Sequence, residues 1–144
     1  MNTYTYEEIS IGHKESFRVI VTEADRDKFR EITGDINPLH NDIEYAKSMG
    51  HEKCVVFGML TASYLSTLAG VYLPGRNSLI QKTEVNFRKP VYVGDELTIT
   101  GEVIDKSDTF NVITVKVEIV NQDNVKVCKG KMEIAVQKEE SLRN

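Results

Sequence analysis

The chain has 144 residues, a formal net charge of -4 at pH 7 and a sequence pI of about 5.4. This length suits one domain over residues 1–144 with a sizeable core, and it argues against a second independent domain. The acidic balance argues against a nucleic-acid binder, which needs a basic face, and no basic cluster suits an anionic membrane. The two cysteines, Cys54 and Cys128, form no Cys-x-x-Cys pair, so neither a zinc knuckle nor a disulfide framework is predicted and a reducing cytoplasm is expected.

The first third of the chain predicts one strand and two helices. Apolar and polar residues alternate over residues 16–21, which is typical of a short strand. Thr22 then opens a helix with Asp25 in a box-like cap, and this helix is expected to end near residues 33–34. A second, short helix is expected from residue 41 or 42 to residue 50.

A long uncharged segment follows, over residues 55–73. Its length would suit a membrane span, but glycine, serine and threonine interrupt it and the mean hydropathy of the chain is -0.32. We therefore expect a buried helix over about residues 58–72, ended by Pro74 and Gly75, because a helix that is apolar all round must be covered all round. Residues 1–8 lack the basic and apolar stretches of a signal peptide, so export is not expected either.

The second half of the chain predicts strands. Apolar and polar residues alternate through most of it, as in strands with one buried face and one exposed face. The expected strands span residues 83–93, 96–105, 111–121 and 125–137, and the expected hairpin turns span residues 105–111 and 121–124. Pro90 suits an edge or a bulge, and the adjacent Val127 and Cys128 break the alternation, so a bulge is predicted there.

Helices that precede a run of strands are typical of an α+β fold with an antiparallel sheet. The sheet needs a cover for its apolar face, and the uncharged helix needs a wrapping. We therefore predict a curled antiparallel sheet around one long central helix. Residues 138–144 are expected to be a frayed tail.

The turn after the first helix holds the most distinctive group of polar residues, Asp35, Asn37 and His40. Five residues along a helix would leave Asp35 and His40 about 140° apart. Pro38 favours a loop instead, because it removes a helical hydrogen bond and biases the residue before it towards an extended backbone. In such a loop the two side chains can converge, although Asp and Asn next to Pro also commonly bond to their own backbone, and a lone histidine is commonly a surface residue.

An acid and an imidazole that meet on one water molecule form a general acid–base pair, which contributes about 10²–10⁴ in rate. Capping alone does not explain Asp35, since a carboxylate just past a helix carboxyl end is unfavourable by about 0.3–1 kcal/mol. A metal site made by His40, Asp42 and Glu44 is a weaker alternative, because the two acids suit the first turn of the next helix. No metal is therefore expected.

The start of the uncharged helix offers the second part of a site. The N–H of Gly58 would be among the unpaired donors of a helix amino end and could bind a developing oxyanion. Close packing between helix and sheet explains this glycine equally well. Ser63 and Ser66 suit hydroxyls that bond back to the preceding turn, and Cys54 or Ser66 as a nucleophile lacks a base nearby in the sequence.

These segments resemble the MaoC-like R-specific enoyl-CoA hydratases, in order, over roughly residues 10–137. The residues that carry the resemblance are Phe29-Arg-Glu-Ile-Thr-Gly-Asp-Ile-Asn-Pro-Leu-His40, Ala46, Phe57-Gly-Met-Leu60 and Val85-Asn-Phe-Arg-Lys-Pro-Val-Tyr-Val-Gly-Asp95. The Gly-Asp-x-Asn-Pro-Leu-His block is the most specific of them. The resemblance implies a hot dog fold, normally assembled as a homodimer or as a larger oligomer built from dimers.

The resemblance also implies roles for particular residues. Asp35 and His40 would activate the water that adds to a trans-2-enoyl-CoA thioester, which gives the (R)-3-hydroxyacyl-CoA. Asn37 would help to shape the site, the Gly58 amide would bind the thioester carbonyl, and Ser66 matches a helix serine near the substrate. Such an enzyme needs no metal or redox cofactor. Coenzyme A does not count as a cofactor here, because it is part of the substrate.

One position departs from the resemblance, because Phe57 stands where the family usually has histidine before Gly-Met. Phe57 is therefore a candidate for altering pocket polarity or acyl preference. The alternatives that stay open are a 3-hydroxyacyl-ACP dehydratase, an acyl-CoA thioesterase and a non-catalytic acyl-CoA-binding domain. Lys82, Arg88 and Lys89 suit either coenzyme A phosphates or, more commonly, solvated cations beside a strand.

Overall fold

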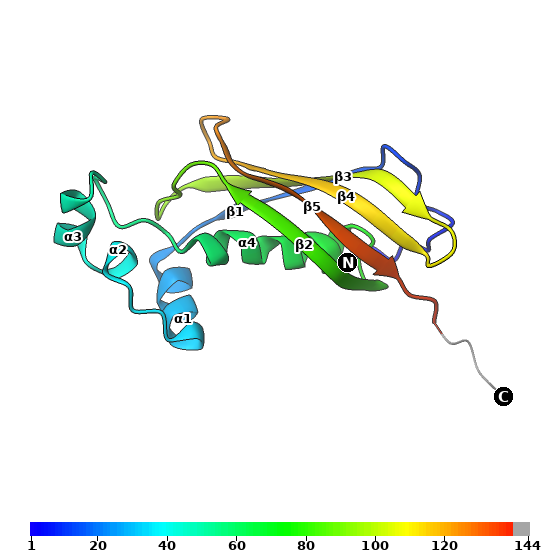
Figure 1. Cartoon of the computed structure of the whole chain (residues 1–144), viewed down its shortest axis with the longest axis horizontal. Coiled ribbons are helices and arrows are strands. Elements are labelled where there is room, and N and C mark those ends of the chain that lie inside the picture. The colour runs from blue at the N-terminus through cyan, green and yellow to red at the C-terminus, as the bar shows by residue number, and fades with distance from the viewer. Residues whose placement is uncertain (140–144) are drawn as a thin grey trace.

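The computed structural model describes residues 1–139, and within them a five-stranded antiparallel sheet curves over one helix (Figure 1). The strands are β1 (Lys14–Ile20), β2 (Ser78–Phe87), β3 (Glu96–Ser107), β4 (Val112–Val120) and β5 (Lys126–Val136), in the order β1-β3-β4-β5-β2. The helices are α1 (Glu23–Thr33), α2 (Pro38–Asn41), α3 (Ile43–Ser48) and α4 (Gly58–Thr67), and α4 continues into a π-helical turn, η1 (Leu68–Tyr72). The predicted architecture, a curled antiparallel sheet with a central helix, is confirmed.

The core lies between the sheet and α4. Every second residue of β3 and β4 is buried, as the alternation predicted, and Ile99 and Val115 are 0% exposed. From the helical side Leu65 and Leu68 are also buried. Burial of large aliphatic side chains of this kind, about 1.5–3 kcal/mol each, is what holds the helix against the sheet.

The expectation that α4 is covered all round is wrong for the single chain. The sheet covers one face of the helix, while Met59 is 65% exposed and Ser63 and Ser66 lie at the surface. Five strands curve around only part of the helix, so the remaining apolar surface faces outwards. Within residues 1–139 the structure has no helix that is long and apolar enough to cross a membrane.

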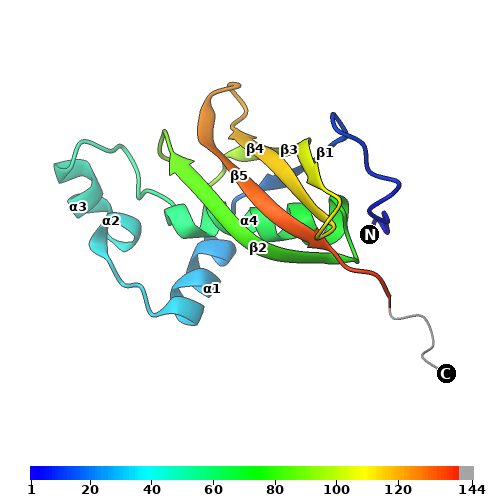
Figure 2. The same ribbon diagram turned by 45° about the vertical axis from the view of Figure 1, so that its right-hand side comes forward.

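Helices α1, α2 and α3 gather beyond the amino end of α4, as two views agree (Figure 1 and Figure 2). The capping box between Thr22 and Asp25 is confirmed, and Gly34 ends α1 with a left-handed φ of 70° that glycine adopts readily. The predicted second short helix is α3, which Asp42 caps. The predicted loop is confirmed before Pro38, since residues 34–37 are irregular and Asn37 is extended, with φ -54° and ψ 131°. Pro38 itself is instead the first residue of α2, the helical position where its missing N–H costs nothing.

Strand ends differ most from the sequence prediction. The strand expected at residues 83–93 begins earlier and ends at Phe87, because β2 pairs with β5 over residues 78–87 and Pro90 lies beyond the last pair. Strand β3 continues to Ser107, so the first hairpin turn is shorter than predicted. The bulge predicted at Val127 is confirmed, since Ile119 pairs with Cys128 and Val120 pairs with Lys126. The frayed tail falls mainly on residues 140–144, outside the described residues.

Candidate active site

Helix α2 carries His40 and is fixed by short-range hydrogen bonds. Asn37 caps it, because its Oδ1 accepts a hydrogen bond from the Leu39 N–H at 3.0 Å. Asn41 at the other end donates to the Asn37 carbonyl at 2.8 Å, and its Oδ1 accepts a hydrogen bond from Arg30 of α1 at 2.8 Å. The side chain of Asn37 is thus engaged in local structure, which is how it shapes this corner.

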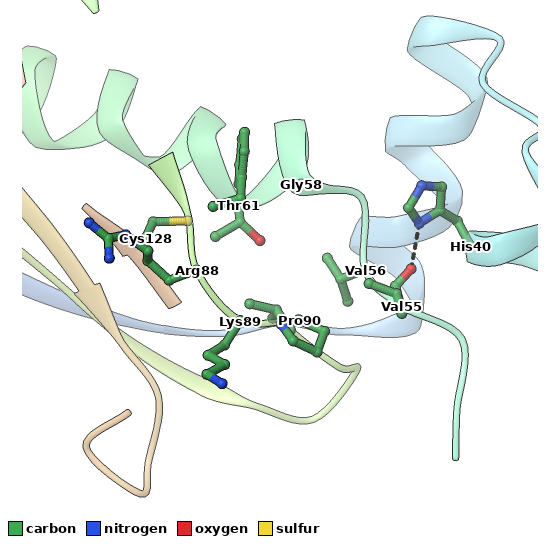
Figure 3. A pocket seen from close by; sticks show the side chains of 11 residues that line it. His40, Val55, Val56, Gly58, Thr61, Arg88, Lys89, Pro90 and Cys128 are labelled. Atoms are coloured by element: carbon green, nitrogen blue, oxygen red, sulfur yellow. Dashed lines mark hydrogen bonds between the residues drawn. The ribbon is translucent and has the colours of Figure 1, made fainter. Parts of the chain in front are cut away.

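The ring of His40 is held in one tautomer. Its Nδ1 lies 2.6 Å from the carbonyl oxygen of Val55, and a carbonyl can only accept, so Nδ1 carries the proton (Figure 3). The N–H of Val55 in turn donates to the Leu39 carbonyl at 3.1 Å, so α2 and residue 55 are linked twice. In the neutral ring Nε2 is therefore the nitrogen with a lone pair, as a general base requires.

Phe57 lies behind His40. Its ring centroid is 4.3 Å from that of His40 and 5.0 Å from that of Phe29, and the side chain is 2% exposed. Phe57 belongs to the core of the described residues and is not among the residues that line the pocket described below. The departure from the usual histidine thus puts an apolar wall against the ring of His40.

Asp35 lies apart from this arrangement. Its Oδ1 accepts a hydrogen bond from the Asn37 N–H at 3.0 Å, and its own N–H donates to the Thr33 hydroxyl at 3.2 Å. The residue is exposed. This is the local side-chain turn that competed with the acid–base interpretation. The single chain therefore does not bring Asp35 to the pocket that His40 lines.

A pocket of about 260 Å³ opens at the amino end of α4, between the helix and the segment after β2 (Figure 3). Its lining residues are His40, Val55, Val56, Gly58, Thr61, Phe87, Arg88, Lys89, Pro90, Val91 and Cys128. Of the predicted site residues it brings together His40 and Gly58. Asp35, Asn37, Phe57 and Ser66 are not among the described lining residues, and Ser66 is exposed on α4.

The position of Gly58 agrees with both interpretations that the sequence left open. It is the first residue of α4, where N–H groups lack helical partners, so its amide is available to an oxyanion. A Cβ at this position would lie 3.2 Å from the ring of Phe87, so close packing also favours glycine. Ser63, in contrast, donates its hydroxyl back to the Leu60 carbonyl at 2.6 Å.

Thr61 is the pocket residue that the sequence did not reveal. It is 1% exposed, and within the described part of the chain its Oγ1 makes no hydrogen bond. A buried hydroxyl without a partner costs about 1–3 kcal/mol. The sequence contained one weak signal, a threonine three residues after Gly58 and hence on the same helical face.

Cys128 also lines the pocket and is likewise new to the site. Burial raises the pKa of its thiol from 9.0 to about 11. A thiol with a raised pKa is a poor nucleophile at neutral pH. The alternative of cysteine-based catalysis therefore gains nothing from this residue.

This thiol predicts a loss of stability in alkali. The unfolded thiol ionises near 9.0 and the folded one near 11, so between these values the folded state holds a proton that the unfolded state has lost. The free energy of unfolding is expected to fall by about 1.4 kcal/mol per pH unit across this window. Urea unfolding under reducing conditions from pH 8 to pH 11 measures it.

Cys128→Ala is the matched control for the alkaline prediction, and it should remove that slope. Tyr6, whose pKa is raised to about 12 by burial and by its hydrogen bond to Asp108, adds a loss above pH 10 that the control keeps. Equal slopes for the parent and the variant between pH 9 and pH 10 would contradict the prediction.

The acids of the alternative metal site have other partners. Asp42 caps α3, with its Oδ1 accepting from the N–H groups of Glu44 and Tyr45 at 3.0 and 3.2 Å. Glu44 lies in the first turn of α3. Both positions agree with the helix-end interpretation. Among residues 1–139 no group of three or more histidine, cysteine, aspartate or glutamate side chains is placed to hold a metal ion.

The curved sheet, the central helix and the histidine at its amino end are those of a hot dog domain of the hydratase type, as the resemblance implied. The chain belongs to the MaoC like domain family, whose model matches residues 8–125. It is 33% identical over 114 residues to the (R)-specific enoyl-CoA hydratase of Aeromonas caviae, which covers 79% of this chain and 85% of that protein. Both the predicted family and the predicted fold are confirmed.

Two further similarities are informative. The R-hydratase PhaJ1 from Pseudomonas aeruginosa, in the unliganded form, matches this structure with a TM-score of 0.87 and 29% identity, over 94% of this chain and 86% of that one. The mitochondrial 3-hydroxyacyl-(acyl-carrier-protein) dehydratase of Arabidopsis thaliana is 34% identical over 97 residues, which are 67% of this chain and 57% of that protein. Relatives thus differ in the carrier that their names give.

Proposed function

We propose that this protein is an R-specific enoyl-CoA hydratase, a hydro-lyase that adds water reversibly to trans-2-enoyl-CoA to give (R)-3-hydroxyacyl-CoA. The observation that carries the proposal is the meeting of His40, with its proton fixed on Nδ1, and the amino end of α4 at one pocket. The family membership and the 33% identity to an (R)-specific hydratase support the reaction class.

The chemistry follows from the two ends of the pocket. The Gly58 N–H binds the thioester oxygen and makes C3 of the enoyl group electrophilic. His40 Nε2 takes a proton from water while the water oxygen bonds to C3, and the resulting enolate charge rests on the oxygen held by Gly58. The protonated His40 then returns this proton to C2, which completes the addition and restores the neutral ring. We assign Asp35 to the water-activating pair from the motif alone. In the single chain its side chain lies at the surface, outside the pocket that His40 lines.

The carrier is the part of the proposal with a close competitor. Arg88 and Lys89 line the pocket and suit the phosphates of coenzyme A, but they equally suit the phosphopantetheine of an acidic carrier protein. The match to a plant acyl-carrier-protein dehydratase keeps that second function open. The ratio of kcat/KM for crotonyl-CoA and for crotonyl-ACP distinguishes them, and we expect it to favour coenzyme A.

The test of function is the loss of enoyl thioester absorbance when the protein is mixed with crotonyl-CoA. We expect a decrease without release of free coenzyme A, and chiral analysis should give the R product. Free thiol would indicate a thioesterase instead. Binding of the thioester without turnover would indicate an acyl-CoA-binding domain and overturn the hydratase. Because no metal or redox cofactor takes part in this proposal, dialysis against a chelator should leave turnover unchanged.

We also propose that the protein forms a homodimer in the cytoplasm. Strand β2 is an edge of the sheet, and its neighbourhood exposes apolar side chains, with Phe87 51% and Met59 of α4 65% exposed. Together with Ala62, Ser63, Thr83 and Val85 they line one apolar hollow. An unpaired edge beside an apolar patch is a surface that a second copy covers well.

Light scattering after gel filtration should give a mass twice the 16.3 kDa of the chain. Met59→Glu places a charge in the hollow and is expected to yield monomers. Phe110→Glu, an equally drastic change at a residue that is 75% exposed in the β3–β4 turn, should leave the dimer intact. A monomeric parent, or a dimer that survives Met59→Glu, would contradict this arrangement. Fractionation of the source cells tests the location.

A further inference from the structure

The hydroxyl of Thr61 has no partner in a place where the helix offers one. Hydroxyls in helices ordinarily bond back to a carbonyl of the preceding turn, as Ser63 does with Leu60 at 2.6 Å. Thr61 is 1% exposed, yet across residues 1–139 its Oγ1 makes no hydrogen bond. Buried polar groups without partners are rare in folded proteins. A hydroxyl that lacks a hydrogen-bond partner and faces a pocket points to a bound group that is not part of the chain.

The position of Thr61 restricts what that group can be. The side chain is directed from α4 into the pocket that Gly58 and His40 also line (Figure 3). Thr61 follows Gly58 by three residues, so the two lie on the same helical face, and side chains tilt towards the amino end of a helix. The Cβ positions of residues at this spacing lie about 5–6 Å apart. Two hydrogen bonds of about 2.7–3.2 Å each can span that distance through one shared acceptor.

We propose that the Thr61 hydroxyl is a second donor to the thioester oxygen of the substrate, beside the Gly58 N–H. The inference rests on the proposed function and deepens it, because it makes Thr61 a catalytic residue that touches the reacting group. No covalent step involves the hydroxyl. Both donors bind more strongly as charge develops on the oxygen in the enolate, which is the condition for lowering the barrier rather than only binding substrate.

A bound structural water fits this site less well. Such a water needs two to four polar partners. Most residues that line the pocket, among them Val56, Phe87 and Pro90, have no polar side-chain atom. A thioester oxygen needs only donors, and the amino end of α4 supplies them. The β-branched side chain is also stiff about χ1, so the hydroxyl is held in place before substrate arrives.

Thr61→Val and Thr61→Ser test the proposal together. Valine keeps the shape of threonine and removes the hydroxyl, whereas serine keeps the hydroxyl and removes a methyl group. For crotonyl-CoA hydration we expect the valine variant to lose about 10²-fold in kcat, the scale for one oxyanion donor, with a smaller change in KM. The serine variant should stay within a few-fold of the parent. The thermal midpoint of the valine variant should equal or exceed that of the parent.

Two results would overturn the proposal, namely full activity in the valine variant, or equal losses in both variants, which would indicate packing. A lower thermal midpoint in the valine variant with unchanged kinetics would indicate a structural water instead. Binding of butyryl-CoA, measured by calorimetry, separates this inference from the hydratase itself. If the parent hydrates nothing, weaker butyryl-CoA binding by the valine but not the serine variant still supports the Thr61 contact, and equal binding by all three proteins refutes it.

Discussion

Replacement of His40 by glutamine is expected to lower kcat for crotonyl-CoA hydration at least about a hundredfold, the scale of a lost acid–base group. The Val55 carbonyl, 2.6 Å from Nδ1, fixes the proton on that nitrogen and leaves Nε2 to take a proton from water. A glutamine amide can occupy a similar position but cannot accept and return a proton. The measurement is the initial rate of absorbance loss at saturating substrate, with KM determined alongside.

His40→Asn is the matched control for fold, because its amide can still donate to the Val55 carbonyl from the place of Nδ1. We expect it to keep the thermal midpoint closer to that of the parent and yet lose activity to the same extent. Asp35→Asn should also lose at least about a hundredfold, and its amide oxygen can still accept the Asn37 N–H. Unchanged turnover in either the His40 or the Asp35 variants would move the catalysis to other residues.

The sequence predicted those parts of the fold that depend on near neighbours. The capping box at Thr22 needs only residues three positions apart, and it formed as expected. The alternation along β4 predicted its buried face, because burial of one face of a strand follows a period of two. Likewise the adjacent apolar residues Val127 and Cys128 break the alternation, and the strand has an extra residue at that place.

The sequence predictions fail where the end of an element depends on segments that are distant in the chain. Strand β2 ends at Phe87, which pairs with Cys128 near the start of β5. No pattern within β2 reveals where its partner strand begins. Helix α2 was missed because a proline was taken as the end of helical structure, although it is favourable as a first residue when Asn37 caps it. The wrapping of α4 was overestimated because a single sheet cannot cover a helix on every side.

The site divides in the same way. Of Asp35, Asn37 and His40, which the motif singled out, only His40 lines the pocket, and the sequence did not point to Thr61 or Cys128. The pocket joins residues 40, 55, 56, 58, 61, 87–91 and 128 from four parts of the chain, which only the folded structure brings together. The segment from Val55 to Gly58 is the element that links them, since the Val55 carbonyl accepts a hydrogen bond from His40 and Gly58 begins α4.

Phe57→Ala is expected to be the most destabilising of these changes, with a loss of about 3–5 kcal/mol in the free energy of unfolding. The ring is 2% exposed and packs against both Phe29 and His40, so truncation leaves a cavity that α1, α2 and α4 share. Urea unfolding at pH 7 measures the loss. A loss in the free energy of unfolding below about 1 kcal/mol would mean that the ring contributes little to core packing.

The kinetic consequence of the same change depends on what holds the ring of His40. The Val55 carbonyl fixes one nitrogen, but a single hydrogen bond leaves the ring able to turn about that bond, and the wall that stops it is Phe57. We therefore expect Phe57→Ala to lose more activity than Phe57→Leu at temperatures where both are fully folded, because leucine retains apolar bulk behind the imidazole. Phe57→His, which restores the residue usual in the family, separates bulk from polarity. If the alanine and leucine variants turn over substrate equally, Phe57 stabilises the fold without orienting the base.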